Sequence, residues 1–323
     1  MKYLNLQTKD PYYNLALEEY LFMNASDDIF MLWQNEPTVV IGKNQNAYAE
    51  VNREYTDSHG IHIARRITGG GAVYHDLGNL NYTFISVGNS EHTLDFAGFT
   101  APIIDALASL GLSAKLSGRN DLEYEGRKFS GNAQYSHVGR VLHHGTLLFD
   151  SDLDVLSSVL LVDEEKIRAK SIRSTRSRVA NLKPLLKGVG SVREFAERIL
   201  DFVRERYAAE ELALPEEGKI DELTRRNSSH GWLYPDRGIA AEYERTVKKR
   251  FSFGTVEVHI GMSGERIKDV RILGDFFGTK DVAELEKYIT GATISELYLI
   301  LTDVDVGSFI YGMTCDELIE LIK

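Results

Sequence analysis

The chain has 323 residues, 43% of them hydrophobic and 26% charged, which is ordinary for a soluble globular protein with one large domain or two. Its net charge of −11 argues against a general nucleic-acid-binding protein, which would normally be basic. The single cysteine, Cys315, excludes an internal disulfide and a cysteine-based metal cluster. Residues 1–6 form no long apolar run, and no stretch approaches the ~18 apolar residues of a membrane span. We therefore expect a cytoplasmic protein with neither nucleic acid nor membrane as a partner.

The first predicted elements are a helix and two strands. Residues 14–23 have the spacing of an amphipathic helix. Residues 30–33 and 38–41 are apolar runs separated by the turn signal Asn35-Glu36-Pro37, so we expect two paired strands.

The most unusual stretch is residues 65–76, Arg-Arg-Ile-Thr-Gly-Gly-Gly-Ala-Val-Tyr-His-Asp. Strand patterns flank its glycines, and glycine lets a ligand approach the main chain, where free N–H groups suit an anion. A neighbouring arginine can bind a phosphate with two hydrogen bonds. A P-loop would need Gly-Lys-Ser/Thr opening a helix, and a dinucleotide fingerprint would need glycine where Tyr74 stands. The stretch is thus either another kind of phosphate or nucleotide cradle, or a plain glycine-rich turn.

Further polar stretches follow a predicted helix at residues 99–110. Residues 117–133 read as a hairpin with its connection at 123–127, and residues 143–146 lead into an apolar strand. Lys128 could supply a mobile positive charge, although an isolated hairpin lysine is more often only a solvated charge. Asp121 could hold Mg²⁺ on phosphates, since this ion uses one or two carboxylates together with phosphate oxygens.

The C-terminal half begins with a basic segment and ends in a different pattern. Residues 170–187 carry six lysines and arginines and no acidic residue, which indicates a solvated loop or a contact for an anionic ligand or acidic partner. Ser191 and Glu194 form a capping-box signal for a helix reaching residue 207. From about residue 250, two alternating strand patterns precede three helices with capping signals. We expect domains at 1–246 and 247–323, the second a small α+β module.

Several catalytic patterns are missing from the sequence. It contains no His-Glu-x-x-His pair, no calcium loop and no Gly-x-Ser-x-Gly elbow. A cysteine nucleophile would have to be Cys315, which lies far in sequence from the glycine-rich stretches and is better explained as a small buried hydrophobe. The remaining candidates are residues that handle phosphate.

These stretches together resemble the lipoate–protein ligase A family in its bacterial two-domain form. The resemblance is carried in order by residues 65–79, 118–121, 127–131, 143–148, 176–182 and 274–278. It implies an α+β fold, with a catalytic domain like those of class II aminoacyl-tRNA synthetases and biotin ligases and a small α+β accessory domain. It also implies that ATP, with Mg²⁺, converts lipoate to lipoyl-AMP, and that the lipoyl group then passes to a lysine of a lipoyl domain. The implied acceptors are 2-oxoacid dehydrogenase E2 subunits and the glycine cleavage H protein.

The resemblance also assigns roles to individual residues. Lys128 would be catalytic and would contact both the lipoate carboxylate and the α-phosphate. The nucleotide would be held by Arg66 and by the backbone of Gly71, Ala72, Val73 and Tyr74. Trp33 and Val73 are candidate walls for the dithiolane tail, although either is equally explained as core. The basic segment 170–187 would close over the adenylate or meet the acidic lipoyl domain.

Three other functions remain as alternatives. An octanoyl or lipoyl transferase shares the fold, but its amidotransferase members use a cysteine nucleophile, and Cys315 lies outside the motif blocks. A biotin ligase has a glycine stretch of different composition. A non-catalytic lipoyl-domain-binding protein would not require a nucleotide cradle. ATP-driven ligation is the favoured prediction.

Overall fold

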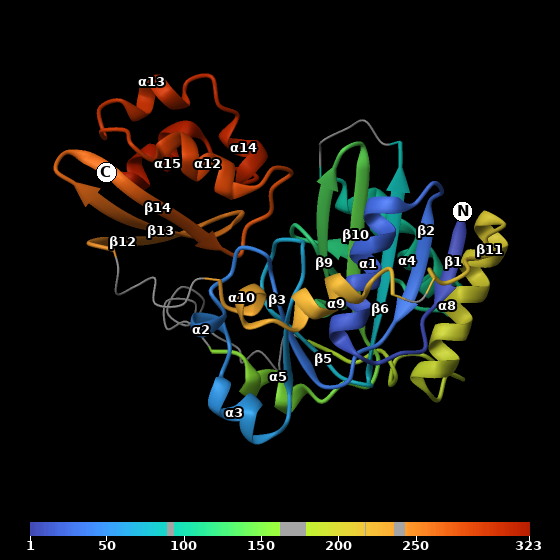
Figure 1. Ribbon diagram of the computed structural model, residues 1–323. Coiled ribbons are helices and arrows are strands. Elements are labelled where there is room, and N and C mark those ends of the chain that lie inside the picture. Colours follow the sequence, from blue (N-terminus) through green and yellow to red (C-terminus); the bar gives the residue numbers. More distant parts are fainter. Residues whose placement is uncertain (89–93, 162–178, 217, 236–242) are drawn as a thin grey trace.

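The computed structural model describes residues 1–88, 94–161, 179–216, 218–235 and 243–323. Within them, the largest sheet has eight strands in the order β11-β1-β2-β6-β10-β9-β8-β7 (Figure 1). The strands of this sheet are β1 (Lys2–Asn5), β2 (Ile29–Trp33), β6 (Asn79–Val87), β7 (Lys115–Ser117), β8 (Asp121–Tyr124), β9 (Arg127–His137), β10 (Arg140–Leu148) and β11 (Glu210–Glu211). β1 is parallel to β2 and β11, whereas the other neighbours are antiparallel. The predicted hairpin around residues 123–127 is confirmed, as β8 and β9.

A second sheet of three strands carries the glycine run. Its order is β4-β3-β5, with β3 at Thr38–Ile41, β4 at His62–Arg65 and β5 at Val73–His75. β4 is parallel and β5 antiparallel to β3, so the glycine run leaves one edge strand and returns as the other. The expected pairing of residues 30–33 with 38–41 is wrong, since β2 pairs with β1 and β6.

The connection between β2 and β3 explains that error. The Glu36 N–H donates to the Lys9 carbonyl at 3.0 Å, and the Asn35 side chain is hydrogen-bonded to Asn14 and His75. These long-range bonds hold the segment against other parts of the chain, so its turn chemistry does not close a hairpin.

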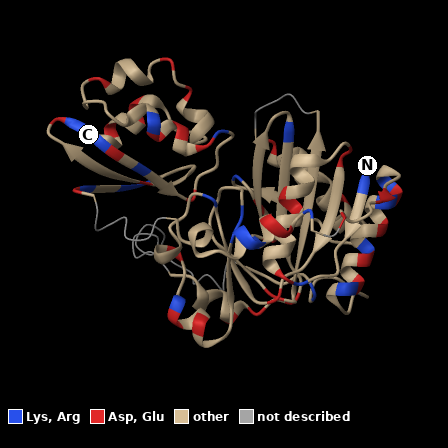
Figure 2. Ribbon diagram, viewed as in Figure 1, with Lys and Arg blue, Asp and Glu red and all other residues tan. Residues whose placement is uncertain are grey.

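Three helices of this part of the chain follow the predictions for residues 14–23, 99–110 and 191–207, whereas the shorter helices were not predicted. The helices of this part are α1 (Pro11–Asn24), α2 (Ala47–Glu50), α3 (Arg53–Ser58), α4 (Phe96–Ser109), α5 (Leu153–Val159), α8 (Val192–Tyr207), α9 (Asp221–Ser228) and α10 (His230–Leu233). Asp10 caps α1 by accepting from the Tyr12 and Tyr13 N–H groups. Ser191 caps α8, but Glu194 accepts from Gly190 instead of completing the expected box. The exposed face of α8 mixes acidic and basic side chains (Figure 2).

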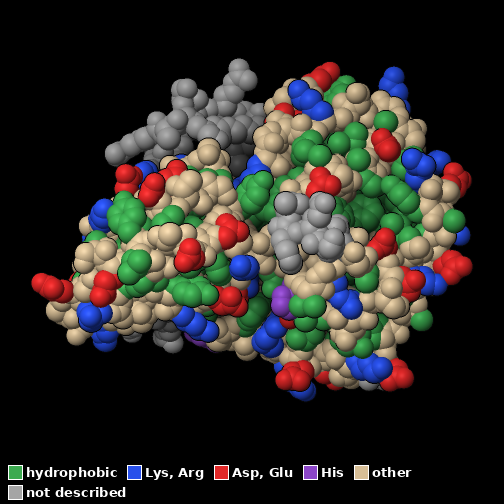
Figure 3. All heavy atoms as spheres, turned by 90° about the horizontal axis from the view of Figure 1, so that it is seen from above, with side chains coloured by type: hydrophobic (Ala, Val, Ile, Leu, Met, Phe, Trp, Pro, Cys, Tyr) green, Lys and Arg blue, Asp and Glu red, His purple; other side chains and the backbone are tan. Residues whose placement is uncertain are grey.

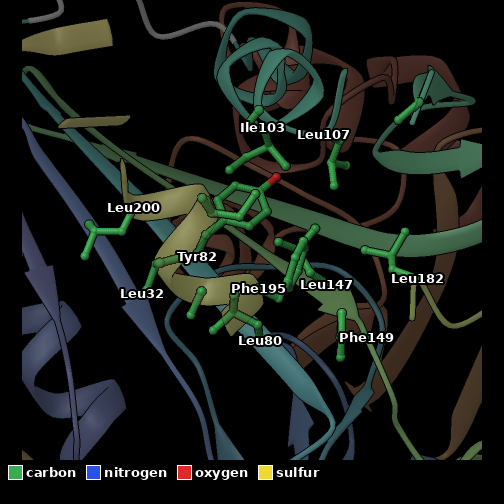
Figure 4. Close-up of a cluster of buried hydrophobic side chains, with 14 of the residues drawn as sticks. Leu32, Leu80, Tyr82, Ile103, Leu107, Leu147, Phe149, Leu182, Phe195 and Leu200 are labelled. Atoms are coloured by element: carbon green, nitrogen blue, oxygen red, sulfur yellow. The ribbon is translucent and has the colours of Figure 1, made fainter. Parts of the chain in front are cut away.

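The alternating side chains of β2 separate two layers of core. Phe30 and Leu32 belong to a cluster with α4 and α8, while Ile29, Met31 and Trp33 pack with α1. In the first cluster, side chains from β6 and β10 meet those of the two helices; the labelled members are Leu32, Leu80, Tyr82, Ile103, Leu107, Leu147, Phe149, Leu182, Phe195 and Leu200 (Figure 4). Both faces of the sheet are therefore covered, and the α1 side is where the sheet meets β3.

The C-terminal part is an α+β unit with its own core. Its elements are β12 (Arg245–Phe251), β13 (Gly254–Ser263), β14 (Arg266–Gly274), α12 (Val282–Ile289), α13 (Leu297–Leu301), α14 (Val306–Phe309) and α15 (Cys315–Ile322). We expected two strands and three helices, but the described residues form three strands and four helices. β12 was missed because its charged side chains, Lys248, Lys249 and Arg250, obscure the alternation.

The capping signals of the C-terminal helices had mixed outcomes. Asp281 caps α12, and Thr314 with Glu317 forms a complete capping box on α15. Thr293 and Glu296 instead make a turn before α13, in which the Thr293 N–H donates to the Glu296 carboxylate. The N- and C-terminal parts form two lobes, with charged side chains of both signs spread over the face seen in Figure 3. Among the described residues, no helix is both long enough and apolar enough to cross a membrane.

Candidate active site

A cavity lies where the glycine run meets the large sheet. Of the predicted site residues, Arg66, Gly71, Ala72, Val73 and Lys128 line it. Its apolar walls are Leu15 of α1, Trp33 of β2, Val40 of β3, Val73 of β5 and Ala133 of β9. Trp33 and Val73 are thus both wall residues, as the tail-tunnel prediction required.

A second cavity adjoins the first. It is lined by the two predicted site residues that the first cavity lacks, Tyr74 and Asp121. The two cavities share Lys128, and they also share Ala72, Val73, Gly131 and Thr146. The structure therefore brings all seven predicted residues to two connected spaces, with Lys128 common to both.

Glycine serves a different structural purpose at each of the three positions of the run. A Cβ on Gly69 would lie 2.4 Å from the Phe276 carbonyl oxygen, and one on Gly70 would lie 2.9 Å from the Phe277 ring. Gly70 has φ +89°, and its N–H donates to the Phe276 carbonyl at 3.2 Å. A Cβ on Gly71 would meet no atom within 4 Å of the described residues. Gly69 and Gly70 therefore allow the C-terminal unit to pack closely, whereas Gly71 leaves space in the cavity.

Arg66 is buried and mostly occupied by the protein itself. Its Nε donates to Thr68 Oγ1 at 2.9 Å, its Nη1 to the Val40 carbonyl at 3.1 Å, and its Nη2 to the Gly69 and Gly71 carbonyls at 2.7 and 2.8 Å. Four of the five N–H groups of a guanidinium are thereby used. Burial lowers the pKa of Arg66 to about 10, with the Glu18 carboxylate opposing this shift, so the side chain remains charged at neutral pH.

Arg65 is also used inside the fold, but elsewhere. Its guanidinium donates to the carbonyls of Gly42, Lys43, Gln45, Trp232 and Leu233. It does not line either cavity. The two adjacent arginines thus fasten different parts of the chain around the glycine run.

Lys128 is placed very differently. Its Nζ lies 2.7 Å from Asp121 Oδ1, and the two side chains are 36% and 34% exposed. A Cβ on Gly131 would lie 3.1 Å from Lys128 Nζ, so this glycine makes room for the lysine side chain. The Lys128 carbonyl accepts from the Ala180 N–H at 2.8 Å, which ties its strand to the segment following residue 178. The lysine is anchored at its backbone and held by one carboxylate at its tip.

The structure gives less support to the predictions about the metal ion and about the basic segment. Within the described residues, no group of three or more His, Cys, Asp or Glu side chains is arranged to hold a metal ion. Asp121 therefore belongs to no such group, and its Oδ1 pairs with Lys128. Of the basic segment 170–187, residues 170–178 lie outside the described residues, and Lys183 pairs with Asp150 at 2.6 Å on the surface.

Sequence reasoning missed Glu18, a carboxylate buried behind the cavity. It lies 2.9 Å from His144 Nδ1, and His144 lines the cavity. The sequence did contain a sign of it, because Glu18 lies three residues after Leu15 and three before Leu21 and so places a charge on the apolar face of the first helix. A charge at such a position needs a buried partner, and the sequence alone does not name that partner.

His75 was quoted in the glycine stretch without a role. Its Nδ1 accepts from the Asn35 amide at 3.1 Å, which leaves the proton on Nε2. Burial lowers the pKa of His75 to about 3, with Arg66 and His144 adding to the effect, so the ring is neutral at physiological pH. His75 also lines the cavity, beside Trp33.

Cys315 lies far from this chemistry. It begins α15 in the C-terminal unit, where it packs against the hydrophobic core. Burial raises the pKa of its thiol, whereas a nucleophilic cysteine needs a lowered pKa. This placement argues against a cysteine mechanism and hence against the transferase alternative.

The fold and site define a class: an α+β protein in which one lysine lines two adjoining cavities beside a glycine run. Two family models cover most of the chain, the lipoyl protein ligase A/B catalytic domain at residues 10–204 and the bacterial lipoate protein ligase C-terminus at residues 240–322. The chain belongs to the lipoate–protein ligase family. The predicted resemblance is confirmed.

Named relatives agree along the full length. The chain is 37% identical to lipoate–protein ligase LplJ of Bacillus subtilis, with 98% of both chains covered, and 38% identical to lipoate–protein ligase 1 of Staphylococcus aureus, with 100% of both covered. ATP-driven ligation is thereby supported over the alternatives.

Solved structures agree in fold. P. falciparum LipL1, solved in complex with lipoate, has a TM-score of 0.81 at 23% identity over 99% of this chain and 98% of its own. The bipartite ligase of Thermoplasma acidophilum, described with its E2 lipoyl domain, has a TM-score of 0.62 at 31% identity over 72% and 95%. Lipoate–protein ligase A bound with ATP has a TM-score of 0.61 at 28% identity over 72% and 98%. The predicted α+β fold is confirmed, as that of lipoate–protein ligases.

Proposed function

We propose that this chain activates lipoate with ATP and transfers the lipoyl group to a lysine of a lipoyl domain. The observation that carries the proposal is Lys128, which lines both cavities. The apolar walls of the first cavity suit the lipoate tail. The nucleotide would lie along the glycine run, from Arg66 and Gly71 in the first cavity to Ala72, Val73 and Tyr74 in the second. A relative solved with ATP supports the nucleotide as a substrate, and a relative described with its E2 lipoyl domain supports a lipoyl domain as the acceptor.

In the first half-reaction, a lipoate carboxylate oxygen attacks the α-phosphorus of ATP. The new bond is a carboxyl–phosphate anhydride, and the bond to the β-phosphate oxygen breaks to release pyrophosphate. Two anions must approach each other, so a cation between them lowers the barrier. Lys128 is positioned for this role, and holding both reactants together provides the proximity contribution.

In the second half-reaction, the neutral amine of the acceptor lysine attacks the activated carbonyl. The carbon–oxygen bond to AMP breaks, an amide forms, and the amine loses a proton. Lys128 stabilises the charge that builds on the phosphate oxygen of the departing AMP. Enclosure of the adenylate would shield the anhydride from water.

Asp121 is the residue that would hold Mg²⁺, and the bound ion would neutralise phosphate charge. Its carboxylate is partly exposed at the second cavity, where Oδ1 pairs with Lys128. A single carboxylate fits an ion that takes most of its ligands from phosphate and water.

The remaining predictions complete this proposal. The acceptors are lipoyl domains of 2-oxoacid dehydrogenase E2 subunits and the glycine cleavage H protein, and the reaction takes place in the cytoplasm. The catalytic domain spans 1–246 and the accessory domain 247–323. Separate hydrophobic cores support a division into two domains, and β12, which begins at Arg245, favours a boundary just ahead of that strand.

The proposal is tested by mass spectrometry of an apo lipoyl domain incubated with the protein, lipoate, Mg²⁺ and ATP. We expect the acceptor mass to rise by one lipoyl group, and no rise when ATP is omitted. Pyrophosphate release should require lipoate or octanoate. Release that is independent of either acid, or modification without ATP, would contradict the proposal.

A further inference from the structure

We infer that Glu18 is the counter-ion of Arg66 and acts as a positioning residue for the nucleotide, through His144 and Thr68. The inference rests on the proposed placement of the nucleotide at the glycine run. It assigns a role to a buried carboxylate that contacts neither lipoate nor ATP in the proposed reaction.

The chain of contacts is continuous. Glu18 Oε1 and Oε2 lie 2.9 and 3.0 Å from His144 Nδ1. His144 Nε2 lies 2.9 Å from Thr68 Oγ1, which in turn accepts from Arg66 Nε at 2.9 Å. The Thr83 hydroxyl also donates to Glu18 at 2.6 Å. All four members of this chain of contacts, Glu18, His144, Thr68 and Arg66, are at most 8% exposed, so these bonds are largely shielded from water.

One assignment of protons satisfies every member. Because Thr68 Oγ1 accepts from Arg66, its own hydroxyl hydrogen is free to donate to His144 Nε2. His144 Nδ1–H then donates to Glu18, which accepts as an ionised carboxylate. A second proton on the imidazole would make His144 a donor to Thr68 and leave the hydroxyl hydrogen without this acceptor. The network therefore connects one negative and one positive charge through two neutral side chains.

The positioning effect follows from planar peptides. Arg66 Nη2 binds the Gly71 carbonyl, and in a trans peptide the N–H of the next residue points to the opposite side. Fixing this carbonyl thus fixes the direction of the Ala72 N–H, which belongs to the proposed nucleotide contact. The peptide between Gly69 and Gly70 shows the same opposition, because its carbonyl accepts from Arg66 while its N–H donates to the Phe276 carbonyl. A loosened Arg66 would therefore misdirect the backbone that receives ATP.

The first test compares Thr68→Val with Thr68→Ser, with pyrophosphate release measured against ATP and lipoate separately. Valine keeps the shape but removes the hydroxyl, so we expect the KM for ATP to rise about tenfold while the KM for lipoate changes less than about twofold. Serine keeps the hydroxyl and should restore the KM for ATP. Thermal melting of both variants checks that the fold is retained. Equal increases for both substrates, or no increase for ATP, would overturn the inference.

A double-mutant cycle tests whether the residues act as one chain. Glu18→Gln should raise the KM for ATP to a similar extent, and combining it with Thr68→Val should add little, because both changes break the same link. Multiplicative effects would show that the residues act independently and would overturn the inference.

Gly71→Val separates this inference from the nucleotide placement. The valine enters open cavity space without a clash within the described chain. If it leaves the KM for ATP unchanged, the placement of the nucleotide is wrong, and this inference falls with it. If it raises the KM for ATP and Thr68→Val does not, the inference alone is wrong.

Discussion

Two cations of the site, Arg66 and Lys128, differ in nearly every physical respect. Arg66 is 5% exposed and makes four hydrogen bonds to groups of its own fold. Lys128 is about a third exposed and has one ion pair, with Asp121. A side chain with most of its donors committed fixes the shape of a loop, whereas a partly exposed lysine can exchange a carboxylate partner for a substrate anion. The comparison therefore assigns shape to Arg66 and chemistry to Lys128.

The largest effect is expected from Lys128→Ala. Loss of the cation between carboxylate and α-phosphate should lower the rate of lipoyl-AMP formation by about 10²–10³-fold, even at saturating substrates. Single-turnover pyrophosphate release measures this rate. Lys2→Ala is the matched control, because Lys2 also pairs with a carboxylate, that of Glu210, but away from both cavities. A rate near that of the unmodified protein would remove Lys128 from its assigned role.

A smaller effect on substrate binding is expected from Arg66→Lys. Lysine keeps the charge but cannot hold Thr68 and three carbonyls at once, so we expect the KM for ATP to rise roughly thirtyfold. The rate at saturating ATP should fall only a fewfold. Arg193→Lys, on the exposed face of α8, is the control. An unchanged KM for ATP would contradict the loop-shaping role.

Asp121→Asn should have a more moderate effect. It removes the ion-pair partner of Lys128 and the proposed ligand of Mg²⁺, so we expect about a tenfold loss of activity at low Mg²⁺ that is partly recovered at high Mg²⁺. The measurement is a Mg²⁺ titration of pyrophosphate release, with Asp150→Asn as the surface control. An identical titration midpoint in variant and unmodified protein would exclude Asp121 as a ligand.

The smallest effect near neutral pH concerns stability. Folding lowers the pKa of His75 from about 6.5 to about 3. As the pH drops below about 6.5, the imidazole is therefore protonated in the unfolded chain while it stays neutral in the folded one, which favours unfolding. The contribution of His75 to the free energy of unfolding is complete above about pH 6.5 and is lost progressively toward pH 3. The free energy of unfolding, measured by urea unfolding at several pH values, should depend less steeply on pH in His75→Asn. His59→Asn, at an exposed position, is the control. An unchanged slope would show that His75 is not the group responsible.

The sequence predicted much of the site because the glycine run is locally unusual. Three consecutive glycines, Gly69, Gly70 and Gly71, indicate an unusual backbone conformation. The hairpin around Lys128 is predicted by its turn residues alone. The ordered blocks then predicted the family. These are short-range patterns, and short-range patterns are what a sequence displays.

What the sequence did not predict depends on contacts between distant residues. The direction of the Arg66 side chain follows from β3 lying between β4 and β5, because the Val40 carbonyl on β3 accepts from it. The partnership of Glu18 with His144 joins residues 126 positions apart. The expected pairing of β2 with β3 failed for the same reason, since long-range bonds of Asn35 and Glu36 replace the hairpin.

The division of labour between Arg66 and Lys128 is tested most directly by single-turnover formation of lipoyl-AMP at increasing ATP. We predict that Arg66→Lys approaches the rate of the unmodified protein as ATP rises, whereas Lys128→Ala stays slow at every concentration. Recovery of Lys128→Ala at high ATP, with Arg66→Lys remaining slow, would contradict the account.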